Sequence, residues 1–406
     1  MIKFRKFLIA IALIPFLLVS SCVKQPEGKV TKSLLIYMVG ENNLSGNTGK
    51  DLKELTSGYV PDYFEVGEGG DVLMVYVNRR NENPKLFRIS KDASGDIVTE
   101  LIMEYEEHNS CDDSVMHNVL SYAANLFPAD YNGLIFWDHG SGWLPSGYYT
   151  NPYSISENGM IVQSAPVEDP YAHLVKSYGY YELGKRSEKE MEVIDLAKAL
   201  PIHYSCIMFD ACLMGGIEVA YELKDKTDYI ISSAAEIMAD GFPYQYIGEL
   251  FFNTEGNFLD GICKSYYDYY NEKGQGATIS LVKTSALSNV ATACMNVFLT
   301  RRSLIPSLNM DDIQGYFRYD RHYFYDLDDF IGRIALPEQY SAFKDAMDKA
   351  VISKYYTENF FIAPGAEFEI KKFSGLSTYI PNPENKFLDE FYKQFAWNKT
   401  VQMIAQ

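Results

Sequence analysis

Five short, largely apolar segments, each followed by a turn, constrain the fold of this chain more than any other feature of its sequence. Continuous apolar runs of this kind are typical of strands covered on both faces of a sheet. Apolar residues at helical spacing occur between several of them. Strands that alternate with helices predict a mostly parallel sheet with helices on both faces. The five segments are residues 33–39, 72–77, 133–138, 206–210 and 229–232.

The second half of the chain has a different pattern, in which helices outnumber strands. We expect an α/β core over residues 33–240 and a C-terminal α/β region over residues 241–406 that packs on it. A hairpin is expected around Ser94 and Gly95. Residues 142–188 are rich in Gly, Pro, Ser, Tyr and Asn and lack periodicity, which predicts an inserted irregular loop. Helices are predicted at 114–126, 190–200, 215–223, 245–252, 258–271, 285–304 and 341–351, and further strands at 277–282 and 377–380.

The N-terminal segment predicts export. A basic start is followed by an apolar run from Phe7 to Val19, which is shorter than the ~20 residues needed to span a bilayer. We therefore interpret residues 1–21 as a signal peptide and 22–32 as a polar tether. The sequence before Cys22 resembles a bacterial lipobox, so we expect Cys22 to carry acyl chains. An ordinary secretory signal with an incidental cysteine is the alternative. The expected location is the bacterial cell envelope, lipid-anchored and facing the periplasm or the exterior.

Charge and cysteine usage exclude some functions. The 54 acidic and 36 basic side chains give a formal net charge of −18, which disfavours nucleic acid as a partner. Six cysteines are present, and none forms a CxxC pair, so a zinc or redox motif is not expected. With Cys22 lipidated, five cysteines are left. An odd number in an exported protein leaves at least one thiol free for chemistry.

His139 and Cys212 each follow a predicted strand, at the edge of the sheet where active sites of such folds lie. A strand end that leads into a helix favours a thiolate at Cys212. Gly140 allows close approach of a substrate and offers an N–H group to an oxyanion. The structural alternatives are a small buried cysteine and a hydrogen-bonded histidine at a strand end. Position alone therefore leaves both interpretations open.

Three segments around these residues resemble the clostripain family of cysteine peptidases, which are related to caspases, legumains and gingipains. They are residues 35–44 (LIYMVGENNL), 133–143 (GLIFWDHGSGW) and 209–214 (FDACLM), and residues 374–381 also fit. The resemblance implies a caspase-like sandwich with a mostly parallel central sheet flanked by helices. It assigns the catalytic dyad to His139 and Cys212, and the oxyanion donors to the N–H groups of Gly140 and Cys212.

The resemblance also implies cleavage after Arg or Lys, with Asp210 at the family's acidic position in the substrate pocket. A strand-end carboxylate satisfied by backbone N–H groups is the structural alternative for Asp210. Asp138 would point to the other side of its strand, so we assign it no charge-relay role. Further pocket candidates on strand-end loops are Asn43, Ser232, Ser233, Glu236 and Asp240.

Relatives activate by cutting themselves after a basic residue, which here suggests Lys185 and Arg186 in the irregular loop. Lys176 also lies in that loop, and Lys189 directly follows it. Some relatives need calcium, but no calcium-loop pattern is present, so we expect no metal or cofactor. The expected partners are proteins or peptides with exposed Arg or Lys. The competing functions are a non-catalytic binding module with the same fold and a hydrolase of another amide bond, such as one in a cell-wall peptide.

Overall fold

The computed structural model describes residues 30–65, 69–149, 153–155, 161–163, 170–176, 190–253, 256–317, 323–382 and 385–405. The predicted signal peptide, Cys22 and most of the tether lie outside these residues, and so do Lys185, Arg186 and Lys189. Within the described ranges, none of the helices combines the length and the apolar character that a membrane crossing requires.

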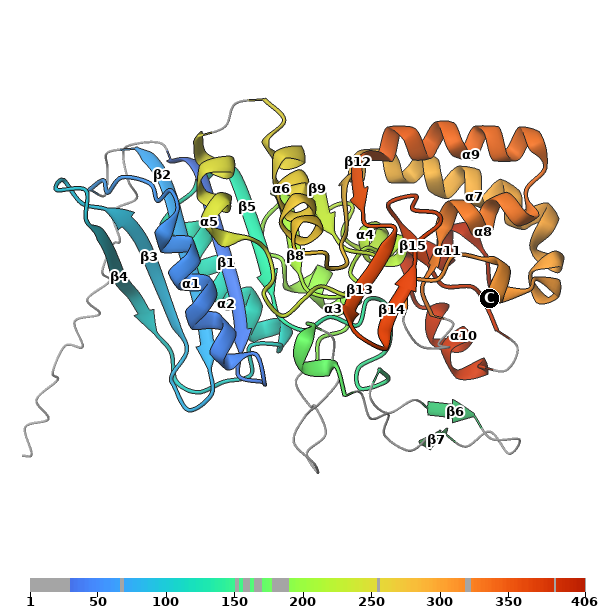
Figure 1. Cartoon of the computed structure of the whole chain (residues 1–406), viewed down its shortest axis with the longest axis horizontal. Coiled ribbons are helices and arrows are strands. Elements are labelled where there is room, and N and C mark those ends of the chain that lie inside the picture. Colours follow the sequence, from blue (N-terminus) through green and yellow to red (C-terminus); the bar gives the residue numbers. More distant parts are fainter. Residues whose placement is uncertain are drawn as a thin grey trace, which may run out of the picture.

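A nine-stranded sheet forms the centre of the molecule, in the order β12-β10-β9-β8-β5-β1-β2-β3-β4 (Figure 1). The five strands from β9 to β2 are parallel, and the pairs at both edges are antiparallel. This arrangement confirms the predicted mostly parallel sheet. The strands are β1 (Val30–Gly40), β2 (Gly70–Arg79), β3 (Lys85–Lys91), β4 (Ile97–Glu104), β5 (Ala129–Trp137), β8 (Tyr204–Asp210), β9 (Thr227–Ser232), β10 (Thr278–Lys283) and β12 (Val351–Tyr356).

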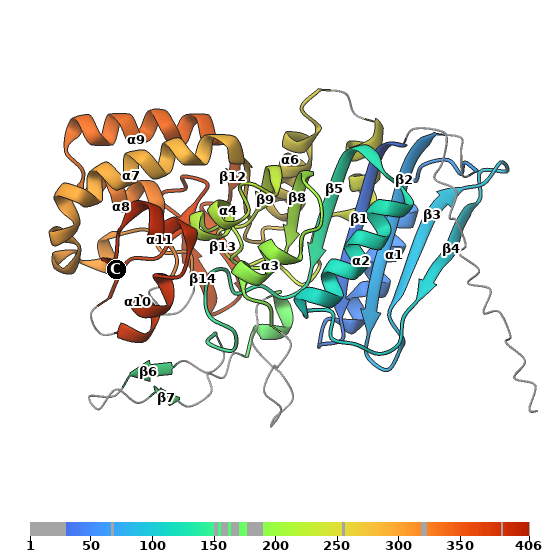
Figure 2. The same cartoon turned by 180° about the vertical axis from the view of Figure 1, so that it is seen from behind.

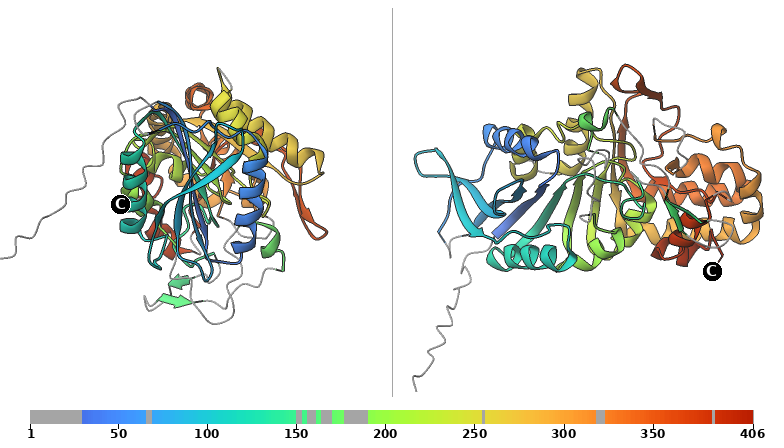
Figure 3. Two further views of the ribbon diagram at one scale, coloured as in Figure 1. Left: turned by 90° about the vertical axis from the view of Figure 1, so that its left-hand side faces the viewer. Right: turned by 90° about the horizontal axis from the view of Figure 1, so that it is seen from below.

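Helices cover both faces of this sheet because its central strands are apolar on both sides. One face carries α1 (Ser45–Ser57), α5 (Tyr244–Gly248) and α6 (Phe258–Glu272), and a π-helical turn (Glu249–Asn253) follows α5. The other face carries α2 (Asp113–Leu126), α3 (Val193–Ala199) and α4 (Ile217–Glu222). The two layers are seen from opposite sides in Figures 1 and 2 and edge-on in Figure 3.

The C-terminal part adds α7 (Leu287–Arg301), α8 (Leu327–Ile334), α9 (Pro337–Ala350), α10 (Lys386–Tyr392) and α11 (Ala396–Val401) beyond the β12 edge (Figure 1). Short strand pairs lie outside the main sheet: β11 (Tyr325–Asp326) with β15 (Ser377–Thr378), β13 (Asn359–Ala363) with β14 (Ala366–Glu369), and β6 (Tyr153–Ile155) with β7 (Ile161–Gln163). Short 3₁₀ helices occur at Ala172–Leu174, Thr284–Ala286, Arg302–Ser307 and Met310–Asp312.

Glu218 ties the C-terminal part to the core. Its buried carboxyl group accepts hydrogen bonds from the Thr378 hydroxyl, the Tyr379 N–H and the Tyr392 hydroxyl. Burial raises the pKa of this carboxyl group. The boundary predicted near residue 240 falls between β9 and α5, and strands from both sides of it share the main sheet.

Candidate active site

Adjacent parallel strands bring His139 and Cys212 to one edge of the sheet. Trp137 at the end of β5 is paired with Asp210 at the end of β8, so each of the two residues follows its strand end by two positions. The turn after Cys212 is sharp: Leu213 has φ +64°, which bulky residues rarely adopt and which is found preferentially at functional sites. His139 and Cys212 therefore lie just beyond the ends of two adjacent parallel strands, as the apolar segments before them predict.

The thiol of Cys212 is buried and faces the segment after β9. Its Sγ accepts a hydrogen bond from the N–H of Ile237 at 3.0 Å and lies 3.4 Å from the Ile237 carbonyl oxygen. The thiol donates to that carbonyl oxygen, so both backbone groups of Ile237 fix the position of the sulfur atom. The residue is thus placed to act as a nucleophile.

His139 is oriented by Asn43, which follows β1 on the other side of β5. The Oδ1 of Asn43 lies 2.6 Å from Nε2 of His139. Because an amide oxygen only accepts, Nε2 carries the proton and Nδ1 is the basic nitrogen of the neutral ring. The pKa of His139 is lowered to about 3, mainly by burial. A hydrogen bond to the backbone of Lys176 raises this pKa, and the Lys176 ammonium group lowers it. Asn43, predicted as a pocket residue, therefore contacts the catalytic histidine candidate.

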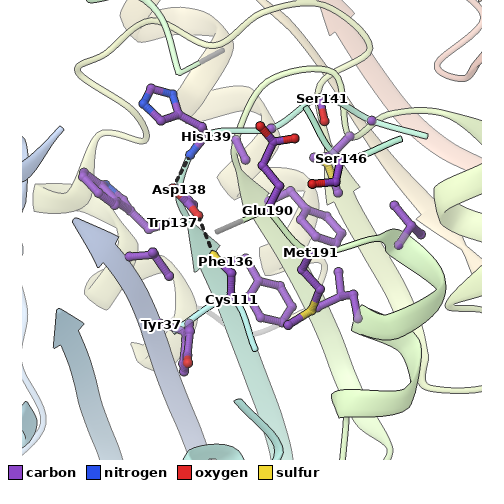
Figure 4. A pocket seen from close by; sticks show the side chains of 18 of the residues that line it. Tyr37, Cys111, Phe136, Trp137, Asp138, His139, Ser141, Ser146, Glu190 and Met191 are labelled. Atoms are coloured by element: carbon purple, nitrogen blue, oxygen red, sulfur yellow. Dashed lines mark hydrogen bonds between the residues drawn. The ribbon is translucent and has the colours of Figure 1, made fainter. Parts of the chain in front are cut away.

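Asp138 contacts the backbone beside the imidazole. Its Oδ1 accepts from the backbone N–H of His139 at 2.7 Å and from the Asn42 amide at 2.9 Å, and its Oδ2 accepts from the Cys111 thiol at 3.6 Å (Figure 4). Burial raises the pKa of Asp138 to about 7. This carboxyl group holds the backbone at the histidine in place; that it has no charge-relay role stays a prediction.

Two backbone N–H groups converge on a single carbonyl oxygen, that of Lys176. The N–H of Gly140 donates to it at 3.0 Å and that of Cys212 at 3.4 Å. Gly140 is required here because a Cβ atom at this position would collide with the carbonyl oxygen of Cys212. The predicted pair of oxyanion donors is thus assembled around a real carbonyl group of the same chain.

The side chain of Lys176 fills a fully buried pocket on the α1 and α5 face. Its Nζ lies 2.6 Å from Oδ2 of Asp210 and 4.2 Å from the centroid of the Trp137 ring. The Tyr244 hydroxyl donates to the same Asp210 oxygen at 2.9 Å. Neither charged side chain is exposed, so the pair is shielded from water. Asp210 therefore binds a basic side chain, as predicted.

A second carboxyl group lies close to this pair. Asp51 on α1 accepts a hydrogen bond from Nε1 of Trp137 at 2.6 Å. The pKa of Asp51 is raised to about 7, mainly by burial. The Lys176 ammonium group lowers this pKa, and the charge of Asp210 raises it. Sequence reasoning missed Asp51, Trp137 and Tyr244. Of these three residues, only Trp137 could have been found from the sequence, because it lies two residues before His139 at the end of a predicted strand.

The segment that carries Lys176 binds as an added strand. The N–H of Lys176 donates to the Ile237 carbonyl, and the N–H of Ala239 donates to the Leu174 carbonyl, both at 2.8 Å. Between them Val175 forms an antiparallel bridge with Met238. Strand addition of this kind is a common mode of peptide recognition. Residues 174–176 are therefore held as a bound peptide would be.

The other predicted pocket residues do not contact Lys176 through any bond found among the described residues. Ser232 ends β9, and Ser233 bonds Thr278 and the Ala235 carbonyl, which supports the loop. Glu236 is buried beside the Tyr149 hydroxyl. Asp240 lies at the surface in ion pairs with Lys50 and Lys273.

No group of three or more His, Cys, Asp or Glu residues in the described ranges is arranged to hold a metal ion. Asp326, in the C-terminal part, caps α8 through the Asp329 N–H and accepts from the Ser374 N–H. The expectation of no cofactor stays a prediction.

Comparison with known proteins agrees with this geometry. The model of the clostripain family (Peptidase C11) matches residues 36–156 and 169–404. None of the curated proteins compared with the chain matches it.

Two solved structures are similar over nearly their whole length. An inactive zymogen C11 protease from Parabacteroides distasonis is 32% identical, with a TM-score of 0.75, and the match covers 92% of this chain and 98% of that one. A secreted C11 cysteine protease from Bacteroides thetaiotaomicron, solved with an irreversible peptide inhibitor, is 28% identical, with a TM-score of 0.73 and coverage of 92% and 100%. These matches confirm the caspase-like fold and favour a peptidase over a binding module. The chain belongs to the clostripain family of cysteine peptidases.

Proposed function

We propose that the protein is an exported, lipid-anchored endopeptidase that cleaves after basic residues, with Cys212 as nucleophile and His139 as base. One observation carries this proposal: the chain's own Lys176 lies in the site as a substrate would. Its ammonium group pairs with Asp210, and its carbonyl oxygen receives the N–H groups of Gly140 and Cys212.

The mechanism follows from these contacts. The Cys212 thiolate attacks the carbonyl carbon after the basic residue, and the N–H groups of Gly140 and Cys212 bind the oxyanion. His139, oriented by Asn43, takes the proton of the Cys212 thiol and passes it to the leaving amine as the C–N bond breaks, so a thioester to Cys212 forms. Water, deprotonated by His139, then attacks the thioester and releases the acid and the thiol.

The pocket fits lysine more closely than arginine. The Cα of Gly241 lies so near the end of the pocket that a Cβ atom there would be 2.6 Å from Nζ of Lys176 and 2.5 Å from Oδ2 of Asp210. A guanidinium group is longer and broader than an ammonium group. We therefore propose lysine as the preferred residue before the cleaved bond.

We further propose that the uncut chain is a zymogen and that the first bond cut is the one between Lys176 and Ser177. A substrate-like segment of the same chain blocks the site, and the Parabacteroides distasonis relative is itself an inactive zymogen. The earlier candidates, Lys185 and Arg186, lie outside the described residues. We rank Lys176 first because its carbonyl oxygen already accepts from the N–H groups of Gly140 and Cys212.

The anchor belongs to the same proposal. We propose that Cys22 is acylated and holds the enzyme in the bacterial cell envelope, because the lipobox-like sequence precedes it directly. A Cys22→Ser variant should move from the membrane fraction to the soluble fraction. A wild-type protein that is soluble without acyl mass on its N-terminal peptide would refute the anchor alone.

Fluorogenic peptides test the activity. After self-cleavage or limited trypsin treatment, the enzyme should hydrolyse Leu-Val-Lys-coumarin faster than Leu-Val-Arg-coumarin, and the norleucine analogue hardly at all. Cys212→Ala should abolish hydrolysis, and Asp210→Asn should lower kcat/KM for lysine by at least about 100-fold, because a buried charge loses its partner. No hydrolysis of any of these peptides would count against the proposed activity.

A further inference from the structure

A second cavity lies on the opposite face of the sheet from the Lys176 pocket. Along a strand successive side chains alternate between faces. Trp137 and Asp210 point into the Lys176 pocket, so Phe136 and Phe209 point to the other side, toward α2 and α3. There they line a cavity with about 670 Å³ of space between atoms, part of it open to solvent (Figure 4).

One end of this cavity is formed by the backbone around the catalytic pair. Gly140, Ser141, Ala211 and Met214 lie within two residues of His139 or Cys212, and all four line it. The segment 237–239, which holds the peptide before the scissile carbonyl, lines no part of the cavity among the described residues. His139 and Gly140 line the cavity, and the N–H of Gly140 donates to the Lys176 carbonyl oxygen, so the cavity lies beside the donor that holds the scissile carbonyl, on the side away from the bound Leu174–Lys176 strand.

The walls suit an apolar side chain. Most of the lining is aliphatic, aromatic or thioether, which is typical of a preformed apolar pocket. Carboxyl groups from Asp138 and Glu190 also line it and disfavour an acidic ligand. The main apolar contributors are Tyr37, Met116, Phe136, Leu144, Leu196 and Phe209.

We propose that this cavity is the subsite for the residue that follows the cleaved bond, and that it takes a bulky apolar side chain such as leucine, methionine or phenylalanine. The inference rests on the proposed peptidase function and adds to it a preference on the leaving side. In the chain's own loop the residue after Lys176 is Ser177, which is too small and polar to use such a subsite. Substrates with an apolar residue there would therefore be cut more readily than the zymogen's own bond.

Internally quenched peptides of the form Leu-Val-Lys-X, followed by a constant tail, test this proposal. The residue X is Leu, Phe, Ser or Asp, and Leu-Val-Lys-coumarin, which has no amino acid at X, is assayed in parallel. Burial of a leucine or phenylalanine side chain should raise kcat/KM by roughly 10- to 100-fold over serine. In the intact chain, Ser177→Leu should likewise accelerate self-cleavage after Lys176.

A filled cavity provides the matched variant. Val193 at the start of α3 lines the cavity, and Val193→Phe would place a ring inside it, while Val193→Ile adds one methylene group. Rates are normalised by active-site titration. The ratio of kcat/KM for the leucine substrate to that for the serine substrate should fall toward one, in part with Val193→Ile and further with Val193→Phe.

The outcomes separate the two proposals. An enzyme that hydrolyses the coumarin peptide but cuts all four X peptides at equal rates overturns the subsite and leaves the proposed function standing. The subsite is also overturned if Val193→Phe leaves the ratio of kcat/KM for the leucine and serine substrates unchanged, in enzyme whose active sites have been titrated. A chain that cleaves neither kind of peptide overturns the proposed function, and the subsite with it.

Discussion

Removal of the Lys176 ammonium group should open the active site of the uncut chain. The ion pair with Asp210 is 2.6 Å long and fully buried, and loss of one partner of such a pair costs about 3–5 kcal/mol. At 1.36 kcal/mol per tenfold change, Lys176→Met should raise the fraction of molecules with an open site by about 100- to several thousand-fold. The backbone hydrogen bonds of the segment are unchanged, so the effect isolates the side chain.

Alkylation of Cys212 by iodoacetamide, followed by peptide mapping, measures this opening. The comparison is made in a His139→Ala background, in which no self-cleavage occurs. When the closed form dominates, the rate is proportional to the open population. Lys198→Met is the matched control, because this exposed lysine pairs with Asp195 at a similar distance of 2.7 Å and such surface pairs contribute little. If Cys212 is alkylated at the same rate in the chain with Lys176 and in the Lys176→Met variant, the reasoning is refuted.

Three further predictions follow from other contacts. Asn43→Ala should lower kcat about 10- to 100-fold with little change in KM, because the His139 ring loses the acceptor that orients it; an unchanged kcat would contradict this role. Because the Lys176 ammonium lowers the pKa of Asp51, which is about 7 with lysine in place, a lysine-based inhibitor should release protons on binding near pH 7. Calorimetry in buffers of different ionisation enthalpy would show this release, and Asp51→Asn should remove it while it keeps an acceptor for Trp137. Glu218→Ala should destabilise the fold by about 3–5 kcal/mol and lower Tm, because three buried donors lose their acceptor; an unchanged melting curve would contradict that estimate.

The positions of the two candidate catalytic residues could be predicted because they depend on local pattern. The apolar segments before His139 and Cys212 indicate buried strands, and parallel neighbours bring their carboxyl ends to one edge. The positions of His139 and Cys212 need only strand type and order, which apolar runs and intervening helices specify. Asp210, two residues before Cys212, was identified by the resemblance to the clostripain family and not by this pattern.

The occupant of the pocket could not be predicted, because it depends on contacts between distant segments. Lys176 reaches Asp210 across 34 residues and bonds the strand-end segment at Ile237, and neither pairing leaves a local pattern. Asp51 lies on α1, which was not predicted as a helix. Its sequence is polar and contains Gly46 and Gly49, so tertiary packing overrides its weak helical propensity.

The most direct test of this account is the intact mass of the purified wild-type chain after incubation, compared with Cys212→Ala. We predict two fragments from the wild type that meet between Lys176 and Ser177, and a single uncut chain from the variant. A first cut at Lys185 or Arg186 with the bond after Lys176 intact, or an identical cut in both proteins, would contradict the claim that the chain holds Lys176 in its active site as its own first substrate.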